Sequence, residues 1–341
     1  MINSTSQIHN DNIITKEKNE EKAQTLHNIT RIEEIIQSEE LDTAQYGCVY
    51  SLIGIPNNRI ITGGWDGNIS ISSYNITAKT WNREVYKEKA HNSGILSLCT
   101  LNNNRLLSGS NDKSIKIWTI SELDITLLKE IKEHIGVIHK LIPLSNERFA
   151  SCSSDKTVRI WKNDDNIYEC ISTLKHDAWV RSILQLRGKE VLVTSNGYFP
   201  SSYILFYNID NYTKEHTVEG YCAGWSSHMV ELSDGNVALS SVKKPHPIVI
   251  IDTSSYQIIT MIQLKDIIPH HSTLYTFNEH SFIYIYEGTF LQISIEDYST
   301  LFQLKEGNFN GCYGGIIPIE GGKYFAIQNN KRIVIIKLCT D

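Results

Sequence analysis

The amino-acid sequence predicts an all-β protein built from repeated four-stranded units. Three observations support this prediction. Two 28-residue segments align without a gap, weaker copies follow at a regular spacing, and each copy consists of short alternating runs rich in Ile and Val. The chain has 341 residues, of which 41% are hydrophobic and 21% charged, so it is apolar enough for a large core. A single all-β domain can use this whole length.

The clearest repeat lies in residues 91–118 and 134–161, which read HNSGILSLCTLNNNRLLSGSNDKSIKIW and HIGVIHKLIPLSNERFASCSSDKTVRIW. In both segments a His is followed by Ser, Asp and Trp at offsets of 17, 21 and 27 residues. The eight matched residues are His91, Ser108, Asp112, Trp118, His134, Ser151, Asp155 and Trp161. Within each segment, two strand-like runs flank an Asn-Asp-Lys or Ser-Asp-Lys turn.

Weaker copies of the same unit extend the repeat along the chain. One equivalent position per copy gives markers at Thr62, Ser108, Ser151, Val193, Leu239, Tyr284 and Ala326. Successive markers are 42 to 46 residues apart, which is close to the length of one four-stranded propeller blade. Because a four-stranded sheet cannot bury both faces alone, the sheets must stack around an axis. The sequence therefore predicts a seven-bladed β-propeller of antiparallel blades.

The end of the chain leaves the seventh unit one strand short. Strand-like residues 334–338 are followed by only three more residues, so no outer strand can follow them. The spare strand-like stretch lies near residues 29–40, and we expect it to cross over and close the ring; the alternative is a short amphipathic helix. Residues 1–28 are polar and of mixed charge, which predicts a disordered tail. Residues 29–341 are then expected to form a single propeller domain.

The repeated residues resemble the WD40 repeat family. The resemblance is specific over residues 45–180 and only periodic from there to the end. Thr119 and Lys162 replace the Asp that closes the family's Trp-Asp pair. The resemblance implies a seven-bladed propeller that serves as a non-catalytic scaffold for protein contacts.

The repeated His, Ser and Asp also raise the question of a catalytic triad. We favour a structural role, in which Asp, His, Ser and the Trp indole form a hydrogen-bonded chain that satisfies buried polar groups. The same set occurs in two units, as expected for a structural device, whereas an active site need occur only once. No catalytic residue is therefore predicted.

Composition and motifs exclude several other functions. The 32 Lys and Arg against 38 Asp and Glu give a net charge of −6, which argues against broad binding to nucleic acid or anionic membranes. No apolar run is long enough for a membrane span, and no signal peptide is evident. The seven cysteines are scattered without a CxxC pair, so neither a disulfide framework nor a metal site is expected. The common nucleotide-binding and hydrolase motifs are missing, and no cofactor is predicted.

A binding surface is predicted where the loop into the first strand of each unit meets the turn between its second and third strands. The aligned repeats place one set of side chains on this narrow face of the ring: Tyr50, Trp65, Leu96, Asn111, His139, Trp179, Arg181 and Trp225. Trp, Tyr and Arg are enriched at interface hot spots. The alternative is that these tryptophans pack between neighbouring blades. Two longer insertions, residues 195–202 and 240–247, are expected in turns on the same face.

The sequence thus predicts a non-enzymatic scaffold that binds a peptide or protein partner. The alternatives are a structural subunit of a larger assembly and an enzyme that uses the central mouth of the ring. We expect a monomeric propeller within a complex, located inside the cell, in the cytoplasm or alternatively the nucleus.

Overall fold

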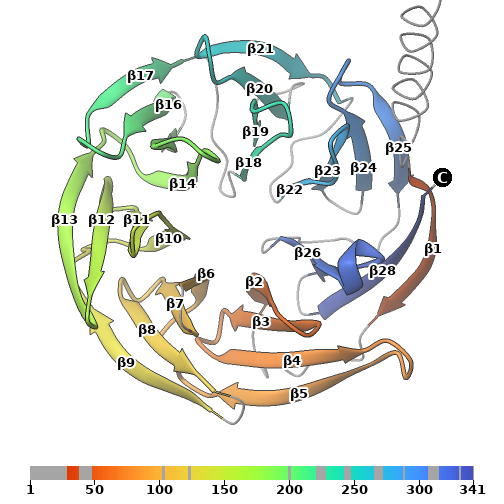
Figure 1. Cartoon of the computed structure of the whole chain (residues 1–341), viewed down its shortest axis with the longest axis horizontal. Coiled ribbons are helices and arrows are strands. Elements are labelled where there is room, and N and C mark those ends of the chain that lie inside the picture. The colour runs from red at the N-terminus through yellow and green to blue at the C-terminus, as the bar shows by residue number, and fades with distance from the viewer. Residues whose placement is uncertain are drawn as a thin grey trace, which may run out of the picture.

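The computed structural model describes most of the chain after residue 28. The described residues are 29–37, 48–101, 104–121, 124–198, 201–219, 228–241, 247–264, 272–286, 289–305, 315–329 and 332–340. They form seven four-stranded sheets arranged as blades around a central axis (Figure 1). The expected disordered tail, residues 1–28, lies outside the described residues.

The first four blades follow one another along the chain, and each is antiparallel throughout. Blade one is β2 (Val49–Ile55), β3 (Arg59–Gly64), β4 (Ile69–Asn75) and β5 (Thr80–Lys87). Blade two is β6 (Ile95–Leu101), β7 (Arg105–Ser110), β8 (Ile115–Ile120) and β9 (Ile125–Ile131). Blade three is β10 (Ile138–Pro143), β11 (Arg148–Ser153), β12 (Thr157–Asp164) and β13 (Ile167–Lys175). Blade four is β14 (Val180–Gln185), β15 (Val191–Tyr198), β16 (Ser201–Asn208) and β17 (Lys214–Val218).

The remaining blades complete the ring. Blade five is β18 (Met229–Glu231), β19 (Val237–Ser240), β20 (Ile248–Asp252) and β21 (Gln257–Ile262). Blade six is β22 (Ser272–Thr276), β23 (Ser281–Tyr286), β24 (Thr289–Ser294) and β25 (Thr300–Lys305). Blade seven contains β26 (Ile316–Ile319), the short 3₁₀ turn η2 (Glu320–Gly322), β27 (Tyr324–Asn329) and β28 (Arg332–Thr340). The predicted all-β propeller of seven four-stranded blades is therefore confirmed.

The fourth strand of blade seven comes from the other end of the chain. Strand β1 (Ile29–Gln37) pairs antiparallel with β28, from Ile29 opposite Thr340 to Gln37 opposite Val334. The stretch expected near residues 29–40 is thus an extended strand in this sheet. Its first backbone N–H also bonds the neighbouring blade, because the amide of Ile29 donates to Oε1 of Gln292 at 2.8 Å.

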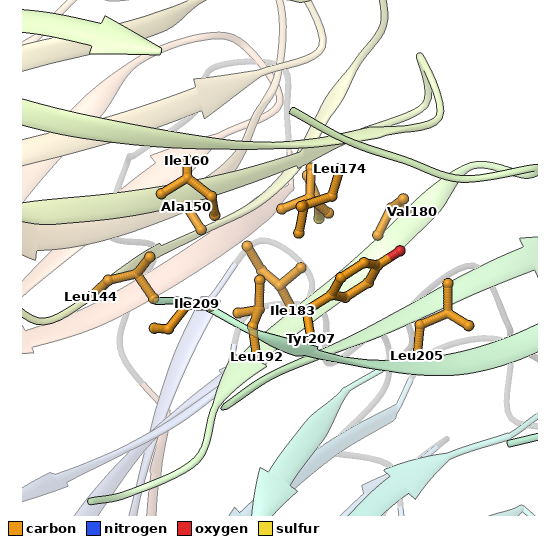
Figure 2. Packing of buried hydrophobic residues seen from close by; sticks show 12 residues of the cluster. Leu144, Ala150, Ile160, Leu174, Val180, Ile183, Leu192, Leu205, Tyr207 and Ile209 are labelled. Carbon is orange, nitrogen blue, oxygen red and sulfur yellow. The ribbon is translucent and has the colours of Figure 1, made fainter. Parts of the chain in front are cut away.

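The hydrophobic core is divided into clusters between successive blades. Inner and middle strands carry nearly continuous buried side chains, as in β7 and β11, whereas the outer strand β9 is exposed along its centre. One cluster joins blades three and four, where Leu144, Ala150 and Ile160 pack with Ile183 and Leu192 (Figure 2). A further cluster joins the first blade to the last. Because each interface buries aliphatic side chains worth about 1.5–3 kcal/mol apiece, stacking of the blades stabilises the ring.

One insertion differs from the prediction. The insertion at residues 195–202 was expected in a turn, but its residues up to Tyr198 and from Ser201 onward are paired parts of strands β15 and β16. In blades two and three the chain turns earlier, because the pairing of the second and third strands ends at Gly109 opposite Ile115 and at Cys152 opposite Val158. The second insertion, residues 240–247, lies mostly outside the described residues. Across the described part of the chain, no helix is both long and apolar enough to cross a membrane.

Candidate functional site

The repeated polar residues of blade two form one connected hydrogen-bond network. Nδ1 of His91 lies 3.0 Å from Oδ2 of Asp112, and its Nε2 lies 2.7 Å from Oγ of Ser108. The indole N–H of Trp118 donates to the same Oγ at 2.7 Å. The Asp112 carboxylate also accepts the backbone N–H groups of Asn92 and Ser114, both at 3.0 Å. The network therefore joins the loop before β6, strand β7 and strand β8.

Blade three repeats this geometry. Nδ1 of His134 lies 2.6 Å from Oδ2 of Asp155, and its Nε2 lies 2.7 Å from Oγ of Ser151. The Trp161 indole donates to that Oγ at 2.8 Å. Thr157 occupies the place of Ser114 and donates its hydroxyl to Oδ1 of Asp155 at 2.6 Å.

Electrostatics holds the two carboxylates in their charged form. Burial raises the pKa of Asp112, but hydrogen bonds from His91 and Ser114 outweigh burial and leave the pKa below its usual value. The pKa of Asp155 is lowered in the same way by His134 and Thr157, against the opposing effect of burial. Burial lowers the pKa of His91, with partial compensation from Asp112. The neutral imidazole of His91, held between the charged Asp112 and Ser108, suits a static support.

The same geometry leaves the serines unsuited to nucleophilic attack. Ser108 and Ser151 are completely buried, and each Oγ already contacts both a His nitrogen and a Trp N–H. A nucleophile must reach its substrate and keep its lone pairs available for the reacting carbon. The arrangement is built to satisfy buried polar groups.

Backbone hydrogen bonds show that the predicted surface residues of the first three blades lie at one end of each blade. The N–H of Trp65 donates to the C=O of Cys48 at 2.8 Å, and the N–H of Asn111 donates to Gly94 at 2.8 Å. In blade three the N–H of Ser154 donates to Val137 at 3.0 Å. The turn after the second strand therefore meets the loop into the first strand in each of these blades. We call this end of the ring the turn face.

Trp65 is the main aromatic side chain of blade one on the turn face. It is 46% exposed, and its ring centroid lies 5.0 Å from that of Tyr50. The ring also covers Gly94 of blade two, because a Cβ added at Gly94 would lie 2.5 Å from Cε3 of Trp65. Trp65 thus packs between blades one and two and still presents almost half of its surface.

Blades three and four contribute a second group, which connects across the blade boundary. The guanidinium of Arg181 lies 4.9 Å from the ring centroid of Trp179, which is 41% exposed. Nη1 of Arg181 donates to Nε2 of His139 at 3.4 Å. Burial, aided by the positive charge of Arg181, lowers the pKa of His139 to about 3, so this imidazole is neutral and can accept the bond. Arg181 itself is buried, and Trp179 is the exposed member of the group.

The other predicted surface residues divide into two groups. Leu96 and Asn111 are half-buried, and Nδ2 of Asn111 donates to Oγ of Ser93 at 3.1 Å. Trp225 lies outside the described residues. The structure therefore brings Tyr50 together with Trp65, and His139 together with Arg181 and Trp179.

One exposed residue was missed by the sequence argument. Ile135 is 80% exposed and directly follows His134 in the loop that enters blade three. Its N–H donates to Oδ2 of Asp155 at 3.2 Å, so the polar network fixes its backbone on the turn face. The sequence signal that could have identified Ile135 is an apolar residue immediately after the network histidine, in the loop that enters the first strand.

The fold and the networks define the class of protein: a seven-bladed β-propeller made of repeated units. Residues 82–119 and 126–162 match the family described as WD domain, G-beta repeat, and they contain both polar networks. Each matched segment begins in the outer strand of one blade and ends within the third strand of the next, so a repeat links two sheets. Two WD40 repeats therefore lie within this seven-bladed propeller.

Two curated proteins resemble parts of the chain. A segment of 79 residues, 23% of this chain, is 34% identical to a "Probable cytosolic Fe-S cluster assembly factor" of Schizosaccharomyces japonicus and covers 13% of that protein. A segment of 98 residues, 28% of this chain, is 33% identical to "Putative E3 ubiquitin-protein ligase LIN-1" of Lotus japonicus and covers 6% of it. The chain thus matches only a small part of each relative's length.

Proposed function

We propose that this protein is a non-enzymatic scaffold that binds a peptide segment or a protein partner on the turn face of the ring. The observation that carries the proposal is the pair Trp65 and Trp179, large aromatic side chains that remain 46% and 41% exposed while neighbouring residues hold them in place. Large rigid side chains bury much area with little loss of conformational entropy, which makes them effective anchors.

The surroundings of these tryptophans support the proposal. Trp65 is positioned by Tyr50 and Gly94, and Trp179 is positioned by Arg181. Ile135 adds a third exposed apolar side chain on a loop whose backbone is fixed by hydrogen bonds. Pre-positioned side chains lower the entropic cost of binding. Burial of both network serines supports a role without catalysis.

The proposal is tested with the double variant Trp65→Ala, Trp179→Ala in the full chain. Affinity purification from native extract with quantitative mass spectrometry should show specific partners of the wild type lost from the double variant. The matched control is Leu127→Ala with Ile167→Ala, which removes exposed apolar side chains, 44% and 61% exposed, from the outer strands β9 and β13. The control should retain the partners.

The double variant must keep the fold, which circular dichroism and thermal unfolding will check. A folded double variant with the same partners as the wild type would contradict the proposal. Loss of partners in both the double variant and the control would also contradict it, because the turn face would then have no special role.

A further inference from the structure

A cleft lies at blade four, next to the end of blade three. The cleft has a volume of about 730 Å³ and opens beside the end of β13, with strands β16 and β17 on its other side. His176, Asn196, Tyr203, Tyr207 and Lys214 are among its lining residues. Volumes of this size are typical of ligand-binding sites.

The cleft occurs where blade four departs from the polar network of its neighbours. His176 occupies the network histidine's place, with Nε2 lying 3.1 Å from Oγ1 of Thr194. Thr194 is thus the equivalent of Ser108, one residue beyond the Val193 marked by the repeat spacing. Tyr207 pairs with Leu192 as Trp118 pairs with Leu106, so tyrosine stands in the tryptophan position.

Within the described residues, no carboxylate hydrogen-bonds His176. Its Nδ1–H instead donates to the C=O of Leu174 at 3.2 Å, and its Nε2 lies 3.4 Å from the Tyr207 hydroxyl. The β15–β16 hairpin runs on to Tyr198 and Ser201, where the other two blades make their Asp turn. The loss of that turn leaves polar groups of blade four facing a cleft.

Asn196 is the residue that this change affects most. It pairs with Val180 as Ser110 pairs with Ile95, so it occupies the place of a network serine. Oγ of Ser110 accepts the N–H of Asp112 at 3.0 Å and donates to Ser93 at 3.1 Å. The Asn196 side chain is only 1% exposed, and neither its Nδ2 nor its Oδ1 has a hydrogen-bond partner. Buried amides are nearly always hydrogen-bonded, so an orphaned one at a cleft indicates a missing partner.

The lining of the cleft defines the chemistry of that partner. An unpaired primary amide offers one donor and one acceptor group side by side, which is complementary to another amide. Lys175 and Lys214 are balanced by Asp177 and Glu219, so the lining favours a neutral ligand over a charged one. Tyrosine rings on the walls suit a flat group.

We propose that this cleft binds the side-chain carboxamide of a Gln or Asn residue presented by a protein partner. The inference rests on the proposed function in that the ligand belongs to a protein, but it depends on different residues from the exposed tryptophans. Asp177 lies two residues before Trp179 in the same loop, so the cleft adjoins the turn face. A partner held at Trp179 can therefore reach the cleft with a neighbouring side chain.

The first test is a titration of the ¹⁵N-labelled full chain with N-acetylglutamine methylamide, followed by NMR. The probe should shift the Asn196 side-chain amide signals and saturate. N-acetylglutamate methylamide, which has a carboxylate in place of the amide, and the apolar N-acetylnorleucine methylamide should bind on the order of tenfold more weakly, because each leaves at least one hydrogen bond unmade. Equal binding of all three probes, or no binding of the glutamine probe, would overturn the proposal.

The second test separates a binding role from a structural one. Asn196→Leu should lower affinity for the glutamine probe by about tenfold or more and raise the thermal midpoint, because it removes a buried amide without a partner. The control Asn68→Leu removes an amide that is bonded to Asp66 and Tyr86, so it should not raise the midpoint and should leave probe binding unchanged. A lowered midpoint for Asn196→Leu would show that the amide is structural and overturn the proposal.

A second variant at Asn196 keeps the test valid if Asn196→Leu does not fold. Asn196→Ser introduces the residue that blades two and three carry at this position, so it should fold and still lose the probe. Probe binding is measured without a partner and with both tryptophans present. A cleft that does not bind the probe therefore says nothing against partner binding at Trp65 and Trp179. Likewise, unchanged partners in the double tryptophan variant would not affect the result for probe binding.

Discussion

The indole ring of Trp65 in blade one lies directly against the Cα of Gly94 in blade two. A Cβ added at Gly94 would come within 2.5 Å of Cε3 of Trp65, closer than non-bonded carbons approach. The absence of a side chain at Gly94 is therefore what allows the ring to lie across the blade boundary. Backbone geometry does not demand glycine here, since the backbone at Gly94 does not have a positive φ.

This contact predicts that Gly94→Ala will displace Trp65 while leaving its chemistry unchanged. The added methyl group must push the ring outward or to one side, so we expect a shift in tryptophan fluorescence and loss of the partners that depend on Trp65. The effect on stability should be modest, on the order of 1 kcal/mol, because the ring is half exposed and can move into solvent. A crystal structure of the variant with Trp65 in its original place would contradict this prediction.

The polar networks predict a cost in stability when their carboxylates are removed. Asp112→Ala leaves the N–H groups of Asn92 and Ser114 and the ring of His91 without their acceptor. We expect a loss of about 1–3 kcal/mol in the free energy of unfolding, measured by urea denaturation. Asp155→Ala should behave alike, because its network has the same connections.

Blade one provides the matched control for these substitutions. In the described part of the chain, the Asp66 carboxylate bonds only the N–H and side-chain amide of Asn68. Asp66→Ala should therefore cost less than Asp112→Ala. Equal losses would mean that the carboxylates stabilise only their local turns and that the histidine connection adds nothing.

Much of the fold could be predicted from the sequence because the repeat fixes both spacing and chemistry. His, Ser, Asp and Trp recur at constant offsets in blades two and three, and four hydrogen-bonded residues leave little freedom for strand register. The structure accordingly places His91 within 2.7 Å of Ser108 and Trp118 within 2.7 Å of the same oxygen.

The weaker copies could not be aligned as well, because aliphatic side chains allow a register shift without an obvious change in pattern. In blade four the repeat spacing marks Val193, whereas the hydrogen bond from His176 selects Thr194. The pairing of Arg181 with His139 was also not predictable, since it joins residues 42 positions apart on different blades. Periodicity indicates which residues face a surface but not which neighbours they contact.

Strand β1 predicts different outcomes for two truncations. Removal of residues 1–28 leaves β1 in place and should not change the thermal midpoint. Removal of residues 1–37 eliminates the burial of Ile29, leaves Oε1 of Gln292 without its donor and exposes the edge of β28. These losses should lower the free energy of unfolding by at least about 2 kcal/mol and promote aggregation through the open edge.

The two truncations should be compared by differential scanning calorimetry and light scattering at equal protein concentration. A midpoint for the longer truncation equal to that of the full chain would show that the seventh blade is stable with three strands. A large loss on removal of residues 1–28 alone would instead mean that those residues contribute to the domain.

His176 predicts how stability depends on pH. Burial, together with the nearby Lys214, lowers the pKa of His176 to about 4 in the folded chain, below the ordinary value of 6.5. Between these values the unfolded chain binds a proton that the folded chain does not, so stability falls as the pH falls from about 6.5 to about 4. The loss between pH 7 and pH 5 should be about 2 kcal/mol for this group. The loss is measured by urea denaturation of the wild type and of His176→Gln at pH 7 and at pH 5. The free energy of unfolding of the variant should fall by about 2 kcal/mol less than that of the wild type over this range. Equal falls in the two proteins would show that the pKa of His176 is not lowered by burial.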